Sequence, residues 1–238
     1  NIVWARKLEK AGCHVIYGLV GLKTHSKCTL VVRREKDGIR RYVHIATGNY
    51  NASTAKLYTD IGLLSCNDKL GVDASAFFNL LSGYSAPPIW DSFIVAPINL
   101  RERCLQLIDR EIEFARNGEA AHMIAKMNSL LAKEIIDKLY EASQAGVKIE
   151  LIVRGICVLI PGIPGISDNI TVRSIVGRFL EHSRIFWFRN GGREEIYIGS
   201  ADWMPRNLND RVELMIPISD DSLKQRIKEM ILLQLADN

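Results

Sequence analysis

Two histidines in the chain are each followed, two positions later, by a cationic side chain: Lys27 follows His25, and Arg184 follows His182. Residues two apart on a strand point to the same face, so each pair can act on one ligand. A neutral imidazole offers a nitrogen lone pair near pH 7. A neighbouring cation can hold a phosphate oxygen while that nitrogen attacks phosphorus. The pattern predicts phosphoryl transfer, with these four residues as the catalytic candidates.

A β-hairpin must position the first pair. Residues 27–33 and 40–45 are rich in β-branched side chains, and Asp37-Gly38 between them favours a tight turn. The turn Gly48-Asn49-Tyr50-Asn51 follows the second arm. We therefore expect Asn49 and Asn51 to lie near His25 as supporting residues.

A second hairpin of the same kind follows His182. Its predicted arms are residues 185–188 and 195–198, and Gly191-Gly192 joins them. Gly199-Ser200-Ala201-Asp202 then matches the polar turn of the first hairpin, which makes Ser200 and Asp202 supporting candidates. The duplication favours a functional role for both histidines. The other three histidines lack this context and are expected to be structural, although His44, on the returning arm of the first hairpin, is also a supporting candidate.

The repetition extends beyond the hairpins. A helix end, an Ala-Gly pair and a predicted strand occur at residues 8–17 and again at residues 143–153. The segments 58–64 and 211–216 each precede a predicted helix. They contain Asp60 and Glu213, which are two further supporting candidates. Self-similarity of this kind predicts two halves of like architecture.

The halves differ at their beginnings. The second half opens with a strand at residues 93–96, a helix at 100–117 and a strand at 122–127, whereas the first half opens on the last turns of a helix. We expect two α/β domains related by a pseudo-twofold repeat, at residues 1–90 and 91–238, with the first truncated at its N-terminus. The boundary is predicted near Ala86-Pro87-Pro88.

The composition is that of a soluble globular protein, with 47% hydrophobic and 24% charged residues. A formal net charge of +4 does not by itself indicate a nucleic-acid partner, although five cations crowd the first hairpin and would attract an anion. Five cysteines without a Cys-x-x-Cys pair indicate neither a disulfide framework nor a zinc site. We expect a cytoplasmic protein, either free or associated with a membrane.

The two histidine motifs resemble the paired His-x-Lys motifs of the phospholipase D superfamily. The aspartate that usually follows is replaced by Val32 and Arg189, and the second motif has arginine in place of lysine, which argues against a phosphodiesterase. The fuller strings resemble, along nearly the whole chain, the C-terminal half of the bacterial polyphosphate kinases. Those strings are LKTHSK, IATGNYN, AKLYTD, LIVRGIC, LEHSRIF and IGSADWMPRNLNDRVE.

This resemblance implies an enzyme that moves the γ-phosphate of ATP onto a histidine and then, reversibly, onto inorganic polyphosphate. It implies that His25 is the phosphohistidine and that His182 contacts ATP and handles protons. The nucleotide-binding residues that it implies are Tyr58, Arg154, His182 and Arg211. It further implies Mg²⁺ bound with ATP to arginines upstream of residue 1, N-terminal and head domains in the same polypeptide, a homo-oligomer, and no nucleic-acid partner.

Two alternatives remain open at this point. A phospholipase D-like phosphodiesterase or nuclease would use the same His25, but its covalent adduct would carry an organic group instead of bare phosphate. Alternatively, the chain is a catalytically silent module that binds only nucleotide or polyphosphate.

Overall fold

The computed structural model describes residues 2–83 and 89–237, and the domain boundary predicted near Ala86-Pro87-Pro88 lies outside them. The helices are α1 (Ile2–Lys10), η1 (Thr54–Lys56), α2 (Asp68–Leu81), α3 (Leu100–Arg116), α4 (Lys133–Gln144), η2 (Asn190–Gly192), α5 (Pro205–Asn209) and α6 (Asp221–Ala236). The strands are β1 (Lys23–Thr24), β2 (Cys28–Glu35), β3 (Gly38–Ala46), β4 (Tyr58–Thr59), β5 (Gly62–Ser65), β6 (Ile94–Ala96), β7 (His122–Met127), β8 (Lys148–Val153), β9 (Ile170–Arg173), β10 (Leu180–Glu181), β11 (Arg184–Phe188), β12 (Glu195–Gly199) and β13 (Arg211–Pro217).

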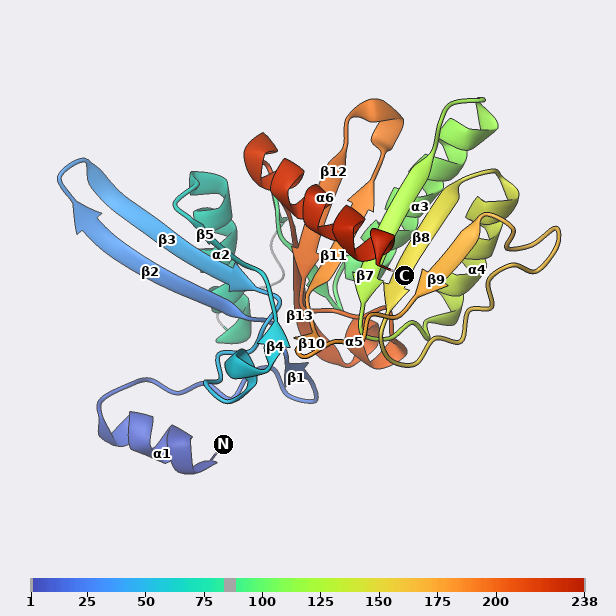
Figure 1. Ribbon diagram of the computed structural model, residues 1–238. Helices are drawn as coiled ribbons and strands as arrows, with labels where there is room; N and C mark the ends of the chain where they lie inside the picture. The colour runs from blue at the N-terminus through green and yellow to red at the C-terminus, as the bar shows by residue number, and fades with distance from the viewer. Residues whose placement is uncertain (1, 84–88, 238) are drawn as a thin grey trace.

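The second half is built on a large twisted sheet. Its strand order is β1-β13-β12-β11-β7-β8-β9, and β6 also pairs with β13. Strands β7, β8 and β9 run parallel because α4 and a long loop connect them as crossovers, whereas β11, β12 and β13 form antiparallel pairs. Helices α3 and α4 cover one face and α6 covers the other, as Figure 1 shows. Because parallel strands end at one edge, the loops after β7 and β8 lie together there.

The first half is smaller and consists of a three-stranded sheet, β2-β3-β5, with α2 packed against it. The β2–β3 ladder runs from the pair Cys28 and Ile45 to the pair Glu35 and Gly38, so the hairpin predicted around Asp37-Gly38 is confirmed. The hairpin projects from the body of the molecule as a long arm (Figure 1).

The two halves exchange short strands with each other. β1, from the first half, pairs with the start of β13 in the second. β10, from the second half, pairs with β4 in the first, and both pairings are parallel. Each histidine motif is therefore attached to a strand of the other half.

A shared core reinforces this exchange. One apolar cluster contains Val43 and Phe77 of the first half together with Val95, Val212 and Ile231 of the second. Burial of such side chains contributes about 1.5–3 kcal/mol each relative to exposure, so separation of the halves would be costly.

The α/β class and the repeated halves are confirmed, but the strand predicted at residues 13–17 does not form. That segment is irregular and mostly exposed, and it pairs with no strand in the described part of the chain. Within residues 2–83 and 89–237, no helix combines the length and the apolar character needed to cross a bilayer.

Candidate active site

His25 lies directly after β1, and the second half holds both its backbone and its ring. Its amide N–H donates to the carbonyl of Val212 over 2.9 Å. Its Nδ1 lies 2.9 Å from Oε2 of Glu213, a fully buried carboxylate. A carboxylate accepts hydrogen bonds, so this contact favours the proton on Nδ1 and leaves the lone pair on Nε2.

His182 repeats this arrangement with the halves reversed. Its amide N–H donates to the carbonyl of Thr59 over 3.1 Å, and its Nδ1 lies 2.7 Å from Oδ1 of Asp60. Asp60 and Glu213 are the candidates that the sequence offered only as supporting residues. The structure makes them the direct ring partners of the two histidines, each reaching across from the opposite half.

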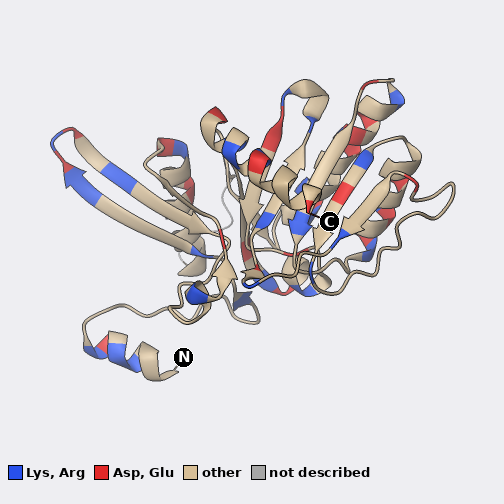
Figure 2. Ribbon diagram, viewed as in Figure 1, with Lys and Arg blue, Asp and Glu red and all other residues tan. Residues whose placement is uncertain are grey.

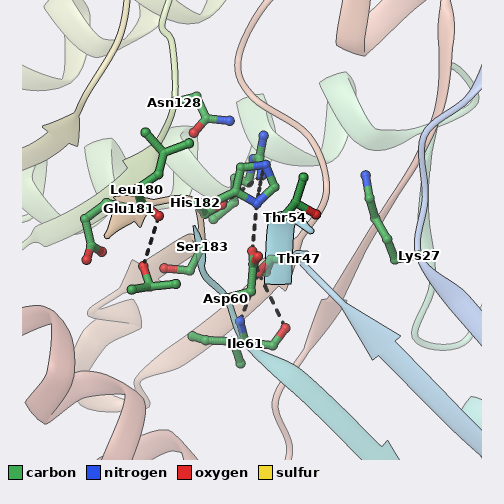
Figure 3. Close-up of polar contacts among 12 residues, drawn as sticks. Lys27, Thr47, Thr54, Asp60, Ile61, Asn128, Leu180, Glu181, His182 and Ser183 are labelled. Atoms are coloured by element: carbon green, nitrogen blue, oxygen red, sulfur yellow. Dashed lines mark hydrogen bonds and ion pairs between the residues drawn. The ribbon is translucent and has the colours of Figure 1, made fainter. Parts of the chain in front are cut away.

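A hydroxyl group steadies each carboxylate. The Ser200 hydroxyl donates to Glu213, and the Thr47 hydroxyl donates to Asp60 over 2.9 Å (Figure 3). The backbone repeats as well, since the amides of Ser200 and Thr47 donate over 2.9 Å to the carbonyls of Leu214 and Ile61. Thr47 is a site residue that sequence reasoning missed. The signal was its spacing, because each hydroxyl precedes its carboxylate by 13 residues.

The two predicted cations are buried beside their histidines. The Lys27 ammonium donates to the backbone carbonyl of His25, and the Arg184 guanidinium donates to that of His182 over 2.7 Å. Burial lowers the pKa of Lys27 to about 8, although Glu213 opposes the shift. Because the pKa of Lys27 also responds to Asp60, Arg184 and Arg211, groups from both halves converge on it.

Arg184 is more tightly held than Lys27. Its Nε donates to Oδ1 of Asp202 over 3.1 Å, and Asp202 also accepts the backbone N–H of Asn128 over 2.8 Å. Its Nη1 lies 3.0 Å from Nε2 and 3.1 Å from Nδ1 of His182. Burial lowers the pKa of His182, and the charges of Arg184 and Lys27 lower it further, against the opposing effect of Asp60. His182 is therefore held neutral at physiological pH.

Of the nucleotide-binding candidates, Tyr58 lies against His182, and Arg154 lies near Tyr58 and Arg184. The Tyr58 ring lies 4.9 Å from the imidazole, centroid to centroid. Arg154 follows the C-terminal end of β8, and its buried Nε has no hydrogen-bond partner within the described residues. Burial and nearby Arg184 lower the pKa of Arg154. An unsatisfied guanidinium donor at this edge is available to an anionic ligand. Arg211 begins β13 opposite Lys23.

Sequence reasoning also missed Lys126, a buried cation on β7. Its ammonium donates to the Ser183 hydroxyl over 2.7 Å and to the carboxylate of Glu181. These two residues flank His182, so Lys126 stabilises the segment that carries His182. Its position among apolar residues, next to the end of β7, was the available signal.

Three supporting candidates have other surroundings. The Asn51 side chain accepts the backbone N–H groups of Ser53 and Thr54 over 2.9 and 3.0 Å and so stabilises the local turn. Nδ1 of His44 lies 2.8 Å from the Tyr50 hydroxyl, on the exposed side of the hairpin. Asn49 is exposed. The contacts of these residues do not join them to either histidine.

The described residues do not offer a ready magnesium site. Nowhere in residues 2–83 and 89–237 do three His, Cys, Asp or Glu side chains gather so that they could hold a metal ion. Asp60 and Glu213 already bind a histidine and a hydroxyl group each. These two carboxylates are therefore not free to act as metal ligands.

Known proteins resemble the chain in both sequence and fold. The chain is 59% identical over all 238 residues to a polyphosphate kinase of Thermosynechococcus vestitus and to one of Halalkalibacterium halodurans. It covers 32% and 34% of those proteins, so it spans about a third of their length. The crystal structure of polyphosphate kinase from Porphyromonas gingivalis superimposes on the whole chain with a TM-score of 0.93 at 40% identity, and the match covers 37% of that protein.

The family models for polyphosphate kinase C-terminal domains 1 and 2 match residues 1–87 and 93–238. The chain therefore belongs to the polyphosphate kinase family.

Proposed function

We propose that the chain forms the catalytic region of an ATP:polyphosphate phosphotransferase, in which His25 carries the phosphoryl group. The observation that supports this most is the contact between Nδ1 of His25 and the buried Glu213 carboxylate. When Nδ1–H of His25 donates to Glu213, Nε2 of His25 keeps its lone pair. In the described part of the chain, Nε2 of His25 takes part in no hydrogen bond. Nε2 is then the nucleophile.

In the first step Nε2 attacks the γ-phosphorus of ATP, a P–N bond forms, the bond to the bridging oxygen breaks, and ADP leaves. In the second step a terminal oxygen of polyphosphate attacks the same phosphorus, and the P–N bond breaks. Glu213 stabilises the positive charge that develops on the imidazole in the first step. Both steps are reversible because no bond is hydrolysed.

Both halves supply the remaining groups. Lys27 and Arg184 balance the charge of the transferring phosphoryl group, as fixed cations do when they are aimed at a developing anion. Arg154, Arg211 and Tyr58 hold the nucleotide. His182, as a neutral imidazole, acts on the same phosphate as a proton carrier. Mg²⁺ enters with ATP, and the other domains of the longer polypeptide and a homo-oligomeric assembly complete the enzyme.

Labelling with γ-phosphate-labelled ATP tests the proposal in the full-length protein. We expect a label that is stable to base and labile to acid, with an adduct on the peptide containing His25 whose mass is that of bare phosphate. An adduct with an organic group would instead make the protein a phosphodiesterase. Binding of ATP or polyphosphate without any adduct would make the chain a silent binding module.

A further inference from the structure

The β2–β3 hairpin is longer than its counterpart in the second half. β2 and β3 have 8 and 9 residues, whereas β11 and β12 have 5 each. Both hairpins connect a histidine to the hydroxyl that contacts the carboxylate of the same half, but that connection takes 22 residues in the first half and 18 in the second. The shorter hairpin makes equivalent contacts, so the outer part of the longer one is not needed to position a histidine.

The tip of the second hairpin is fastened to the body of its domain. Glu194 pairs with Lys228 of α6 over 2.6 Å, and Glu195 pairs with Arg110 of α3 over 2.9 Å. The β2–β3 tip, by contrast, projects into solvent (Figure 1). In the described part of the chain, the ion pairs of this tip lie within the hairpin itself, because Arg40 pairs with both Asp37 and Glu35.

The projecting part is strongly basic. Residues 33–41 contain five cations and two carboxylates, and Arg40 occupies both carboxylates. Arg33, Arg34 and Lys36 are exposed and take part in no ion pair within the described residues. Figure 2 shows these basic positions along the arm, well away from the junction of the halves. Cations of like charge repel one another, so three unpaired cations on one tip favour an anionic partner.

We infer that the β2–β3 tip, defined as Arg33, Arg34 and Lys36, binds inorganic polyphosphate at a second site outside the catalytic centre. This inference rests on the proposed function. Eight residues of β2 span about 25 Å, so the tip can contact only a chain that extends far beyond the phosphate being transferred. A linear polyanion fits a row of exposed cations, and binding releases its counterions in the same way as for nucleic acids. The tip then keeps a long chain attached between transfers.

The test variant is Arg33→Gln, Arg34→Gln and Lys36→Gln combined, in the full-length protein. The control carries Arg116→Gln, Lys133→Gln and Lys148→Gln, which remove the same charge from exposed sites on α3, α4 and β8. Binding of long-chain polyphosphate, tripolyphosphate and ATP is measured over a series of salt concentrations. Circular dichroism establishes that both variants fold.

We expect the hairpin variant to bind long-chain polyphosphate about tenfold more weakly than the wild type, with a slope of log K against log salt reduced by about 2. Its affinity for tripolyphosphate and ATP should equal that of the wild type, because these ligands, when bound at the catalytic centre, are too short to extend to the tip. The control should keep wild-type affinity for all three. Equal losses in both variants, or an unchanged affinity of the hairpin variant for long chains, would overturn the inference and leave the proposed function intact.

Two further measurements separate other polyanions. If the hairpin variant loses binding to vesicles of phosphatidylcholine and phosphatidylserine while keeping its affinity for long polyphosphate, the tip is a membrane contact and the inference is wrong. If the hairpin variant loses binding only to duplex DNA, the inference is also wrong. If the wild type binds no polyphosphate of any length, the proposed function itself fails.

Discussion

The two histidine sites have the same architecture, but their rings have different neighbours. Each site has a histidine, a carboxylate from the other half, a hydroxyl group and a cation on the histidine carbonyl. At His182 the Arg184 guanidinium also lies 3.0 Å from Nε2 and 3.1 Å from Nδ1, whereas in the described residues no cation lies within hydrogen-bond distance of the His25 ring. The duplicated fold thus builds the same arrangement twice, and the Arg184 guanidinium beside the ring distinguishes His182 from His25, whose Nε2 has no hydrogen-bond partner in the described residues.

Removal of the two rings should have the most unequal effects. His25→Ala should abolish both the phosphoenzyme and polyphosphate synthesis, since a methyl group has no lone pair to attack phosphorus. His182→Ala should lower turnover by about 10²–10⁴-fold, the range for a lost proton carrier, and should keep some label on His25. Labelling and initial rates in the full-length protein measure both. His44→Ala is the control, and it should keep some phosphoenzyme. Undiminished label in His25→Ala would move the nucleophile elsewhere.

The carboxylates offer the next comparison. Glu213→Gln keeps the size of the side chain but no longer favours the Nδ1–H tautomer of His25, so turnover should fall by about 10³–10⁴-fold, as when a histidine loses the carboxylate that orients it. Asp60→Asn acts on the partner ring and should cost about 10–100-fold. Steady-state rates and the rate of phosphoenzyme formation measure both losses. Equal losses, or a larger loss for Asp60→Asn, would contradict the difference between the two sites.

The cations should matter through turnover more than through binding. Lys27→Ala and Arg184→Ala should each lose about 3 kcal/mol of transition-state stabilisation, the usual size for one fixed donor to a developing anion. The loss should appear in kcat, with an unfolding transition near that of the wild type for Lys27→Ala. Unfolding of either variant without a specific kinetic effect would make that side chain structural.

Lys27 also gives a pH test that Arg184 does not. Its pKa is lowered to about 8, so its positive charge is present below that pH and is lost as the pH rises through it. The profile of kcat/KM should therefore have an alkaline limb near pH 8. Lys27→Arg keeps its charge and should move that limb to higher pH. A limb that stays in place in Lys27→Arg would assign the titration to another group.

The hydroxyl groups should give the smallest effects. Ser200→Ala and Thr47→Val each remove one hydrogen bond to a carboxylate, which corresponds to about 1 kcal/mol, or roughly fivefold in turnover. Ser200→Ala should slow phosphoenzyme formation, because Ser200 steadies Glu213 and so His25. Thr47→Val should leave that step closer to the wild-type rate. Single-turnover measurements resolve the two, and identical effects would show that the hydroxyls do not act through separate histidines.

Local patterns were sufficient to predict both hairpins, because Asp37-Gly38 and the alternation of β-branched residues are encoded over short distances. The same reasoning failed at residues 13–17, where strand propensity has no neighbouring strand to pair with in the described chain. The four catalytic candidates were found from duplication, and the structure brings their side chains to the junction of the halves.

The pairing of His25 with Glu213 and of His182 with Asp60, each across the two halves, could not be predicted from local sequence patterns. It depends on two-residue strands, β1 and β10, that pair with β13 and β4 from the other half. Such short strands have almost no pattern of their own, and their partners lie more than 100 residues away in sequence. Thr47 is not evident from the repeat, because matching Gly48 with Gly199 sets Asn49, and not Thr47, opposite Ser200.

The position of the phosphoryl group on the imidazole tests the central claim most directly. If Glu213 from the second half holds Nδ1 of His25, phosphorus can bond only to Nε2. NMR spectroscopy of the phosphorylated full-length protein, with ¹⁵N-labelled histidine and ³¹P detection, distinguishes the two isomers. We predict Nε2-phosphohistidine at His25. A P–N bond at Nδ1 of His25, or a phosphoryl group on His182, would contradict the account.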